Sequence, residues 1–400
     1  MTESLEALPY EGLRVVEFAH MVMGPSCGLV LADLGAEVIK VEPPSGDSTR
    51  GLLGSGAGFF PLFNRNKKSI ILNLQTPEGR EAALKLIDTA DVVLENFRPG
   101  TMQRLGLDYV TLKNRNPRLV YASLKGFLPG PYENRTALDE VVQMMGGLAY
   151  MTGRPNDPLR AGASVNDIMG GMFGAIGIMA ALAQRQHTGM GQLVQSALFE
   201  NNVFLVAQHI MQYAATGVPA SPMPERVSAW GIYDVFEVNQ GEQIFLAVVS
   251  DTQWVTFCRA LGFDDLLLDG RLSSNNQRVE ARAWLIPVIR ERIKGFSKQA
   301  LSAIFERQGL PFAPITAPHD LLDDPHLHSA GGFVPVRLTD GPKAGRLAQA
   351  ALLPLALSEH RLGLRLQPPR AGEHSYELLS ELGYSGEQIE RLTGSPLPTE

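Results

Sequence analysis

The sequence predicts a two-domain α/β protein whose larger domain is a doubly wound, Rossmann-like parallel sheet. Three observations support this class. Short apolar runs alternate with helical segments through the first third of the chain, the 400-residue length exceeds one ordinary core, and the composition shifts sharply at residues 219–224 (PASPMP). Alternating strands and helices build parallel sheets with helices on both faces, and chains of this length usually divide into domains.

The larger domain is expected to begin with a βαβ unit. Five strands are expected, each a short apolar run: 13–18, 37–41, 69–74, 91–96 and 118–124. The helices expected between them span 24–34, 77–89, 102–105 and 109–114. Strand, helix and strand in this spacing give parallel pairing through a right-handed crossover.

Ligands of such sheets bind beyond the carboxyl ends of the strands. Basic residues are expected near these ends: Arg65, Lys67, Lys68, Arg104 and Lys125. They suit either a solvated charged face or a phosphate-rich ligand.

The stretch that organises the chain is 162–192, where residues 168–183 carry no charge and are rich in Gly and Ala. The run is shorter than the roughly 20 apolar residues of a membrane span, so we expect an apolar helix deep inside a protein core. Each Gly costs a helix about 1 kcal/mol against Ala. We therefore expect a second chain or a ligand to pack closely on this helix. A further long apolar helix is expected over 193–215.

A second, α+β domain is expected after the linker. Two strand-like runs, YDVFEV and QIFLAVV, flank Asn239-Gln240-Gly241 as in a hairpin, and helical segments continue to about Gln308. We assign residues 1–218 to the larger domain, 225–330 to the smaller one, and 335–400 to a segment that completes the larger one. The last part of that segment, 372–390, is expected to be helical.

The totals exclude several classes of protein. A net charge of −7 argues against a general nucleic-acid binder. Only two cysteines occur, Cys27 and Cys258, which argues against a disulfide framework or a zinc site, and no metal is expected. The acidic N-terminal segment lacks the pattern of a signal peptide. We expect a cytoplasmic enzyme without membrane contact.

Local motifs give weaker signals. The Gly-rich loop 46–58 lacks the GxGxxG order and is interpreted as a surface loop or lid. GPSCG at 24–28 matches GxSxG, but Ser26 lies eight residues past its strand, whereas a nucleophile elbow needs the serine on the turn directly after one. His20 follows a strand and is either structural or a ligand-facing base.

Asp167, directly before the apolar run, has two interpretations. It is either the N-cap of the helix or a carboxylate used in chemistry, because a carboxylate at the edge of an apolar core is costly unless paired or used. As a nucleophile, it can attack an activated acyl group. The helix N-terminus at Ile168 would then stabilise the oxyanion through backbone amides.

Several ordered motifs resemble the class III CoA-transferases, the family that includes formyl-CoA transferase, carnitine CoA-transferase and α-methylacyl-CoA racemase. These are LRVVEFAHMVMGPSCGLVLADLGAEVIKVEPPSGDSTR, FNRNKKSIILNLQTPEGR, ADVVLENFRPGTMQRLGLDY, the Asp167 stretch and AGEHSYELLSELGY. The resemblance implies an interlocked homodimer and a CoA domain built from both termini. It also implies acyl-CoA and carboxylic acid substrates, with no permanently bound cofactor.

The same resemblance implies that Asp167 is the catalytic nucleophile and that five residues hold CoA: Leu72, Asn96, Phe97, Arg104 and Lys125. Two departures are visible. Pro43 stands where the family commonly has a basic contact to the nucleotide, so Lys67 or Lys68 would have to supply it. Val22, with Met23 beside it, stands where formyl-CoA transferase has a glutamine, which argues against oxalate chemistry.

Three functions remain at this point: a CoA-transferase, a racemase or isomerase that uses Asp167 as a base, and a non-catalytic acyl-CoA binder. The racemase pattern places a histidine at Leu138, which cannot exchange a proton; Glu140 or His20 would have to substitute for it. For a transferase, we expect succinyl-CoA or a similar donor. A dicarboxylate acceptor such as itaconate or mesaconate would be received by Arg50, Arg65 or Arg154.

Overall fold

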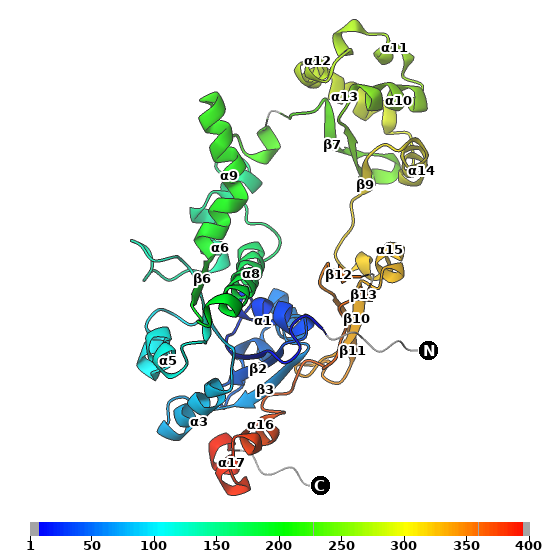
Figure 1. The fold of residues 1–400 in the computed structure, drawn as a ribbon. Coiled ribbons are helices and arrows are strands. Elements are labelled where there is room, and N and C mark those ends of the chain that lie inside the picture. The colour runs from blue at the N-terminus through cyan, green and yellow to red at the C-terminus, as the bar shows by residue number, and fades with distance from the viewer. Residues whose placement is uncertain (1–7, 227, 359, 395–400) are drawn as a thin grey trace. The chain divides into compact units, whose positions relative to one another are not determined.

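The computed structural model describes residues 8–226, 228–358 and 360–394. The chain divides into two compact units: residues 1–222 together with 325–400, and residues 223–324. The first carries a six-stranded sheet in the order β3-β2-β1-β4-β5-β6. All five pairings are parallel, from Val38 opposite Lys67 at one edge to Lys125 opposite Ala197 at the other. Figure 1 shows the sheet and its helices.

The five expected strands and the helices between them follow the expected order, with ends shifted by at most three residues. The strands are β1 (Arg14–Phe18), β2 (Glu37–Glu42), β3 (Lys67–Ile71), β4 (Val92–Glu95), β5 (Val120–Lys125) and β6 (Leu193–Ala197). The helices are α1 (Met23–Asp33), α2 (Phe59–Phe63), α3 (Pro77–Asp88), α4 (Thr101–Leu105), α5 (Tyr109–Arg115), α6 (Asp139–Met145), α7 (Leu148–Thr152), α8 (Val165–Thr188) and α9 (Leu198–Thr216). The segment 46–58, expected as a surface loop or lid, contains two 3-10 turns, Ser48–Gly51 and Gly54–Gly58.

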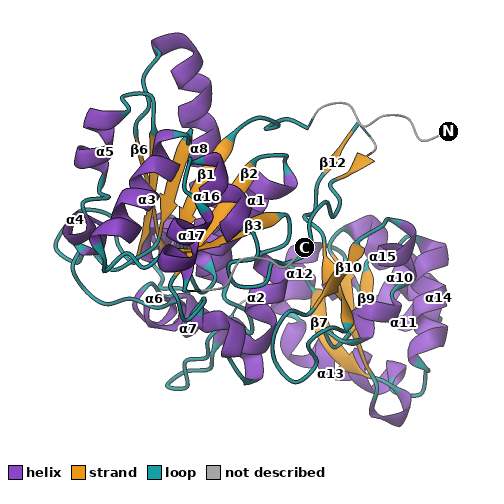
Figure 2. Cartoon of the chain, turned by 90° about the horizontal axis from the view of Figure 1, so that it is seen from below, coloured by secondary structure: helices purple, strands orange, loops and turns teal. Residues whose placement is uncertain are grey.

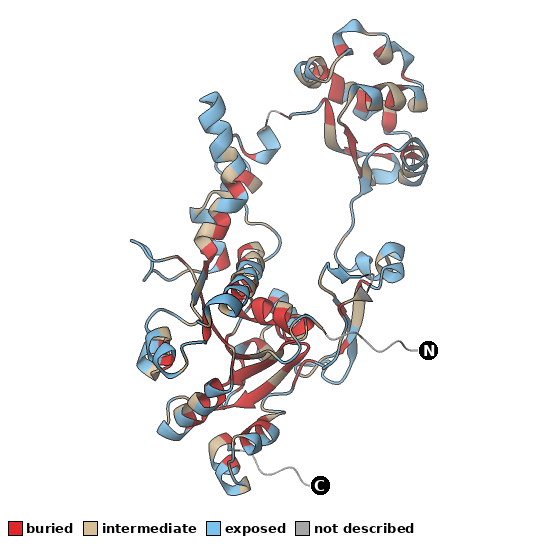
Figure 3. Ribbon diagram, viewed as in Figure 1, coloured by how far each residue is buried: buried red, intermediate tan, exposed pale blue. Residues whose placement is uncertain are grey.

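Helices cover both faces of the sheet, as a doubly wound fold requires (Figure 2). The apolar side chains of α1 and α8 pack against one face. Those of α3, α4 and α5, and of the C-terminal helices α16 (Ser375–Glu381) and α17 (Gly386–Thr393), pack against the other. Strands β1 to β5 are buried along most of their length, and Figure 3 shows them largely in red. Because both faces are covered, the strands read as continuous apolar runs rather than alternating ones.

The sequence-based expectation of one helix over 193–215 was wrong for its first five residues. Leu193–Ala197 pairs with β5 as the sixth strand, and the helix starts at Leu198. The carboxyl end of β6 therefore runs directly into α9. This connection places the start of α9 beside the site described below.

The close neighbour of the Gly-rich helix is α1 of the same chain, not a second chain or a ligand. A Cβ on Gly171 would lie 2.0 Å from Ser26 Oγ, and one on Gly174 would lie 2.8 Å from Leu124 Cδ2. The glycines therefore let the α8 backbone come close to the α1 backbone and to the Leu124 side chain of β5. Ser26 lies buried within α1 and donates to Met23 O, so it is not a nucleophile elbow.

The expectation of an all-round buried helix was also only half right. Gly170, Gly171, Gly174 and Ile178 are buried, whereas Met172, Phe173 and Ile176 are exposed in the single chain. Within the described residues, α8 has the length and hydropathy of a membrane span. Because its glycine face packs on α1 and β5, we treat it as a core helix.

The C-terminal part of the first unit lies against the edge strand β3. It contains α15 (Pro325–Ser329), β10 (Phe333–Arg337), β11 (Leu347–Ala351), β12 (Ala356–Leu357), β13 (His360–Arg361), α16 (Ser375–Glu381) and α17 (Gly386–Thr393). Ser69 N donates to His374 Nδ1 at 3.2 Å, and Ile71 N donates to Ser375 Oγ at 3.0 Å. These bonds satisfy the free backbone edge of β3, which would otherwise be open to pairing.

The second unit has its own core. Its sheet is antiparallel, in the order β7 (Ile232–Glu237), β8 (Gln243–Val248) and β9 (Phe312–Pro314). Its helices are α10 (Asp251–Leu261), α11 (Asp264–Leu267), α12 (Asn275–Glu280), α13 (Arg282–Ile293) and α14 (Lys298–Gln308). The inner side chains of β7 and β8 pack with these helices around Phe257 and Ile289.

Candidate active site

Asp167 lies in the first turn of α8, two residues inside the helix rather than at its cap. Ser164 occupies the cap position and makes no side-chain cap bond, so the N-cap interpretation of Asp167 was wrong. The amides here already have acceptors. Ile168 N donates to Ser164 O at 3.0 Å, and Asn166 N and Asp167 N donate to Asp139 Oδ1 at 2.8 and 3.2 Å. The Ile168 amide is therefore not free to donate a hydrogen bond to an oxyanion, although the sequence suggested that role.

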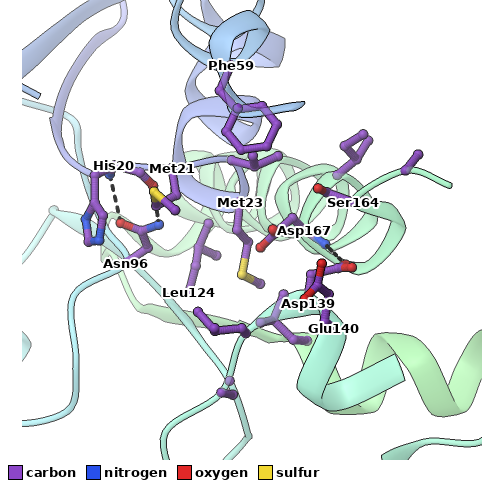
Figure 4. Close-up of a pocket in the computed structure, with 18 of the residues that line it drawn as sticks. His20, Met21, Met23, Phe59, Asn96, Leu124, Asp139, Glu140, Ser164 and Asp167 are labelled. Carbon is purple, nitrogen blue, oxygen red and sulfur yellow. Dashed lines mark hydrogen bonds between the residues drawn. The ribbon is translucent and has the colours of Figure 1, made fainter. Parts of the chain in front are cut away.

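The cap of α8 comes from α6. Asp139 is buried, and its Oδ1 accepts the two amides of α8 while its Oδ2 accepts Gln143 Nε2 at 2.5 Å. Gln143 Oε1 in turn accepts Ala161 N at 2.8 Å. A carboxylate at a helix N-terminus complements the helix dipole, so this position of Asp139 stabilises the start of α8. Figure 4 shows the two side chains on facing elements.

The environment of Asp167 disfavours its charged form. Burial raises the pKa of its carboxyl, the nearby negative charge of Asp139 raises it further, and the charge of Arg160 opposes them, which gives a pKa of about 7. A carboxyl with this pKa is charged in about half of the molecules near neutral pH and keeps more basicity than an ordinary aspartate. Such a group can act as a nucleophile toward an activated acyl carbon or as a proton acceptor.

Asp167 faces a large cavity that runs from α8 to the carboxyl ends of the strands. The cavity holds about 1560 Å³, which exceeds the roughly 300–1,000 Å³ of an ordinary small-molecule pocket. A second cavity of about 500 Å³ lies past the ends of β2 and β3. The two share four wall residues: His20, Ser48, Phe97 and Arg98. This arrangement suits a long ligand whose reactive end lies at Asp167.

The five residues expected to hold CoA are not all on the cavity walls. Asn96, Phe97 and Lys125 line the larger cavity, and Leu72 and Phe97 line the smaller one. Arg104 lines neither; it is exposed on α4 and donates to Thr101 Oγ1 at 3.0 Å. Sequence reasoning therefore placed four of the five at the two cavities.

Two of these side chains also hold the cavity wall together. The Asn96 amide donates to His20 O at 2.8 Å, and its oxygen accepts His20 N at 3.1 Å, which fixes the loop after β1 to the loop after β4. Lys125 Nζ donates to Glu95 Oε2 at 2.6 Å and to Phe97 O at 2.5 Å. The His20 ring lies against the Phe97 ring with centroids 5.6 Å apart, and burial lowers the pKa of His20.

Several basic residues are structural, which corrects the sequence analysis. Lys67 and Lys68 begin β3 and so lie at its amino end, not its carboxyl end. Lys67 Nζ is buried 2.8 Å from Glu17 Oε2, and Lys68 pairs with Glu37 and Glu377. Neither lines the smaller cavity, where Pro43 lies. Neither therefore replaces the basic contact that is missing at Pro43.

The three arginines expected to receive an acceptor acid also lie elsewhere. Arg65 is buried and pairs with Asp33 at 2.6 Å. Arg50 pairs with Glu42 at 2.6 Å and stacks on the Phe60 ring at 3.7 Å. Arg154 is exposed and lines neither cavity. A positive charge that does act on Asp167 is that of Arg160, which the sequence did not indicate.

Part of the wall at Asp167 is apolar. Val22, Met23 and Leu138 all line the larger cavity, where the sequence comparison with formyl-CoA transferase and the racemase expects a glutamine and a histidine. Met23 and Leu124 lie beside Asp167 in Figure 4. An apolar wall accounts for the burial that raises the pKa of Asp167.

Comparison with known proteins gives one family. A family model described as CoA-transferase family III matches residues 10–375. The chain is 33% identical to a succinate–glutarate CoA-transferase of Agrobacterium fabrum, covering 97% of this chain and 98% of that protein. It is 33% identical to a succinyl-CoA:mesaconate CoA-transferase of Haloarcula marismortui, covering 93% and 96%. A crystal structure of a CAIB/BAIF family protein from Brucella suis superposes with a TM-score of 0.82 at 35% identity, covering 94% of this chain and 100% of that one.

Proposed function

This chain belongs to CoA-transferase family III and is a CoA-transferase, and we propose that it works through a covalent intermediate on Asp167. The observation that carries the proposal is a half-buried carboxyl with a pKa of about 7 on the wall of a cavity of about 1560 Å³, a volume that suits a ligand as large as a CoA thioester. A carboxylate of raised basicity attacks an acyl carbon more readily than an ordinary aspartate.

In the proposed reaction, the Asp167 carboxylate attacks the carbonyl carbon of the donor thioester, the C–S bond breaks, and CoA leaves as the thiolate. The thiolate then attacks the aspartyl carbonyl of this anhydride. The donor acid departs, and an aspartyl-CoA thioester remains. The acceptor carboxylate attacks that thioester and repeats the sequence in reverse, so the products are the acceptor thioester and free Asp167. No redox step occurs. The positive end of α8 favours the negative charge that develops near Asp167.

We place the nucleotide part of CoA in the smaller cavity, beside Leu72, and the reactive tail past Phe97 in the larger one. Lys125 contributes positive charge on this path, although its ammonium already bonds to Glu95. Arg104 stays a candidate for an outer phosphate contact, because its neighbours Thr101 and Leu105 line the smaller cavity. No permanently bound cofactor enters this scheme, and we propose a cytoplasmic location.

We propose a dicarboxylic donor and acceptor, with succinyl-CoA as the donor to test first. The two relatives named above use succinate, glutarate and mesaconate according to their names. The test is mass spectrometry of the CoA esters formed from succinyl-CoA and a panel of mono- and dicarboxylic acids, itaconate and mesaconate included. Formation of no new ester with any acid would overturn the proposal.

The racemase alternative lacks a histidine at the position where the racemase pattern has one. Leu138 occupies that wall position, His20 lies on the part of the wall shared with the smaller cavity, and Glu140 is paired with Arg160 in the free enzyme. A two-base exchange needs a titratable group on each face of the substrate carbon. The CoA-transferase proposal needs only Asp167.

The pH dependence gives one prediction. Since only the carboxylate attacks, kcat/KM for the donor is expected to fall on the acid side with a midpoint near pH 7, the pKa of Asp167. Asp139→Asn removes the negative charge that helps to raise this pKa, so the midpoint should move to lower pH. The position of the midpoint, rather than the height of the profile, is the measurement. Glu133→Gln, on the same cavity wall, is the control. An unmoved midpoint in Asp139→Asn would contradict the assignment.

We further propose that the first unit forms the core of an interlocked homodimer. Large apolar side chains on α8 and α9 are exposed in the single chain: Met172, Phe173, Ile176, Phe204, Leu205, Ile210, Met211 and Tyr213. Figure 3 shows most of the C-terminal half of α9 in pale blue, the colour of exposed residues. Apolar surface of this kind usually marks an interface.

The dimer predicts slow subunit exchange. Interlocked chains separate only by unfolding, so two differently tagged dimers should not exchange subunits over hours at nanomolar concentration. Native mass spectrometry of the mixture measures this. Rapid formation of mixed dimers would indicate a simple face-to-face pair, and a monomer would rule out the dimer.

A further inference from the structure

The larger cavity contains an ion pair that the proposed reaction does not use. Arg160, in the segment between α7 and α8, pairs through Nη1 with the carboxylate of Glu140, in the first turn of α6. Its Nε donates to Ala161 O at 3.1 Å. Both side chains line the cavity together with Asp167, and they remain 36% and 58% exposed. The pair is therefore open to a ligand in that cavity.

Arg160 lies within electrostatic reach of the reacting carboxyl, because its charge lowers the pKa of Asp167. The other cations on the wall are engaged or more distant from the reaction. Lys125 is held between Glu95 and Phe97 O, and Arg98 lies on the wall shared with the smaller cavity. Arg135 stacks over the Tyr132 ring at 4.8 Å.

Glu140 can be displaced at little cost. Exposed ion pairs contribute little to stability, and the Glu140 side chain is already more than half exposed. A guanidinium binds a carboxylate through two parallel N–H donors, a geometry that lysine does not offer. A carboxylate of the substrate would therefore take the place of the Glu140 carboxylate. Arg160 would be paired with a carboxylate both before and after binding.

We propose that Arg160 binds the distal carboxylate of a dicarboxylic substrate whose reacting carboxyl lies at Asp167, and that Glu140 occupies this position in the free enzyme. Arg160 is then the residue that selects dicarboxylic over monocarboxylic acids. This inference rests on the proposed function, since it requires an acid to react at Asp167. It also replaces Arg50, Arg65 and Arg154, which lie elsewhere.

The test compares succinate with butyrate, which has the same carbon chain and lacks the distal carboxylate. In a two-stage transfer, kcat/KM for the acceptor depends only on the second stage, so the choice of donor does not affect the comparison. Arg160→Met is expected to lower the succinate-to-butyrate ratio of kcat/KM by about tenfold to a hundredfold, the range for a lost charge-assisted hydrogen bond. Arg154→Met, an exposed arginine outside both cavities, should leave the ratio unchanged.

Glu140→Gln should have the opposite effect on the preference for succinate if a substrate carboxylate displaces Glu140 from Arg160. Without its carboxylate, Arg160 has no competitor, so KM for succinate should fall several-fold while that for butyrate stays the same. If Arg160→Met folds poorly, Arg160→Lys serves instead and should lower the ratio partway. If Arg160→Met lowered kcat/KM for succinate and for butyrate by the same factor, the inference would be overturned, and Arg160 would be a positioning residue for Asp167.

The two levels of the proposal fail differently. A wild-type enzyme that transfers CoA to succinate and butyrate equally well would overturn the role of Arg160 and leave the CoA-transferase reaction intact. A wild-type enzyme that transfers CoA to neither acid, nor to any other in the panel, would overturn the proposed function itself.

Discussion

Asp167→Asn is expected to lower CoA transfer by at least roughly 10⁴-fold, the scale seen when a nucleophile is removed, and to make the protein more stable at pH 8. The amide cannot attack a thioester, and the neighbouring carboxylates Asp139 and Glu140 already have partners in the free enzyme. Asp139 Oδ1 accepts the amides of α8, and Glu140 pairs with Arg160. Because Asn has almost the same volume as Asp, the cavity is preserved.

The gain in stability follows from the raised pKa. Burial, and then the charge of Asp139, raise the pKa of Asp167 from 3.8 to about 7 in the folded protein. Between these values the folded chain binds more protons than the unfolded one, so this group's contribution to stability falls as pH rises. The destabilisation is absent near pH 3 and fully present above pH 7. At about 1.4 kcal/mol per unit of pKa, its upper limit is about 4 kcal/mol.

Calorimetry at pH 8 and pH 4 tests this, with transfer measured in parallel. The melting temperature of Asp167→Asn should exceed that of the wild type at pH 8, and the difference should shrink at pH 4. Asp157→Asn is a matched control, since Asp157 is 75% exposed and faces Arg154 only at 3.9 Å. A less stable Asp167→Asn protein at pH 8 would mean that the carboxyl is stabilised in place rather than strained.

The elements of the sheet were predictable because both of its faces are covered. Strands buried on both sides are continuous apolar runs, and five of the six were visible as such. The sixth, Leu193–Ala197, was missed because it is not a buried apolar run and continues without a break into an apolar helix. Only its pairing with β5 makes it a strand.

The nucleophile candidate was predictable, and its surroundings were not. Asp167 stood out because it was a lone charge before an uncharged run. Asp139 caps α8 from 28 residues away, and Arg160 is paired across 20 residues, so neither partnership leaves a local signal in the sequence. The best available signal was an acidic pair, Asp139 and Glu140, at a helix start. It indicates a first helical turn but not which other helix the carboxylate caps.

The same limit explains the errors over basic residues. The third strand was placed two residues too late, at 69–74 instead of 67–71, which put Lys67 and Lys68 outside the strand. The pairing of Arg65 with Asp33 and of Lys67 with Glu17 depends on the strand order β3-β2-β1. Charged residues in a sequence are therefore assigned to a ligand too readily when their buried partners lie on neighbouring strands.

Beneath the cavities, three cations and three carboxylates form a buried network that connects the loop after β1 with the loop after β2. Its members are Lys40, Lys67, Arg50, Glu17, Asp47 and Glu42. Lys40 is its central cation. Its side chain is 0% exposed, and Nζ lies 2.7 Å from Asp47 Oδ2 and 2.6 Å from Ala19 O. Both of these partners line the smaller cavity.

Lys40→Met is expected to destabilise the protein by about 3–5 kcal/mol, because it leaves a buried carboxylate without its cation. Burial alone would raise the pKa of Asp47, but the charge of Lys40 and the bonds from Lys40 and Thr49 hold it below its usual range. A carboxyl of lowered pKa contributes stability that is lost as pH falls through that pKa. The difference between the variant and the wild type should therefore be large at pH 7 and shrink in strong acid.

Urea unfolding of Lys40→Met and Lys68→Met compares the loss of a buried lysine with the loss of a partly exposed one. Lys68 pairs with Glu37 and Glu377, whose side chains are 29% and 49% exposed, so its loss should cost less than about 1 kcal/mol. Because Ala19 and Asp47 form part of the proposed nucleotide cavity, Lys40→Met should also raise KM for the donor thioester, and Lys68→Met should not. Equal shifts in the two variants would show that the buried network contributes no more than a surface pair.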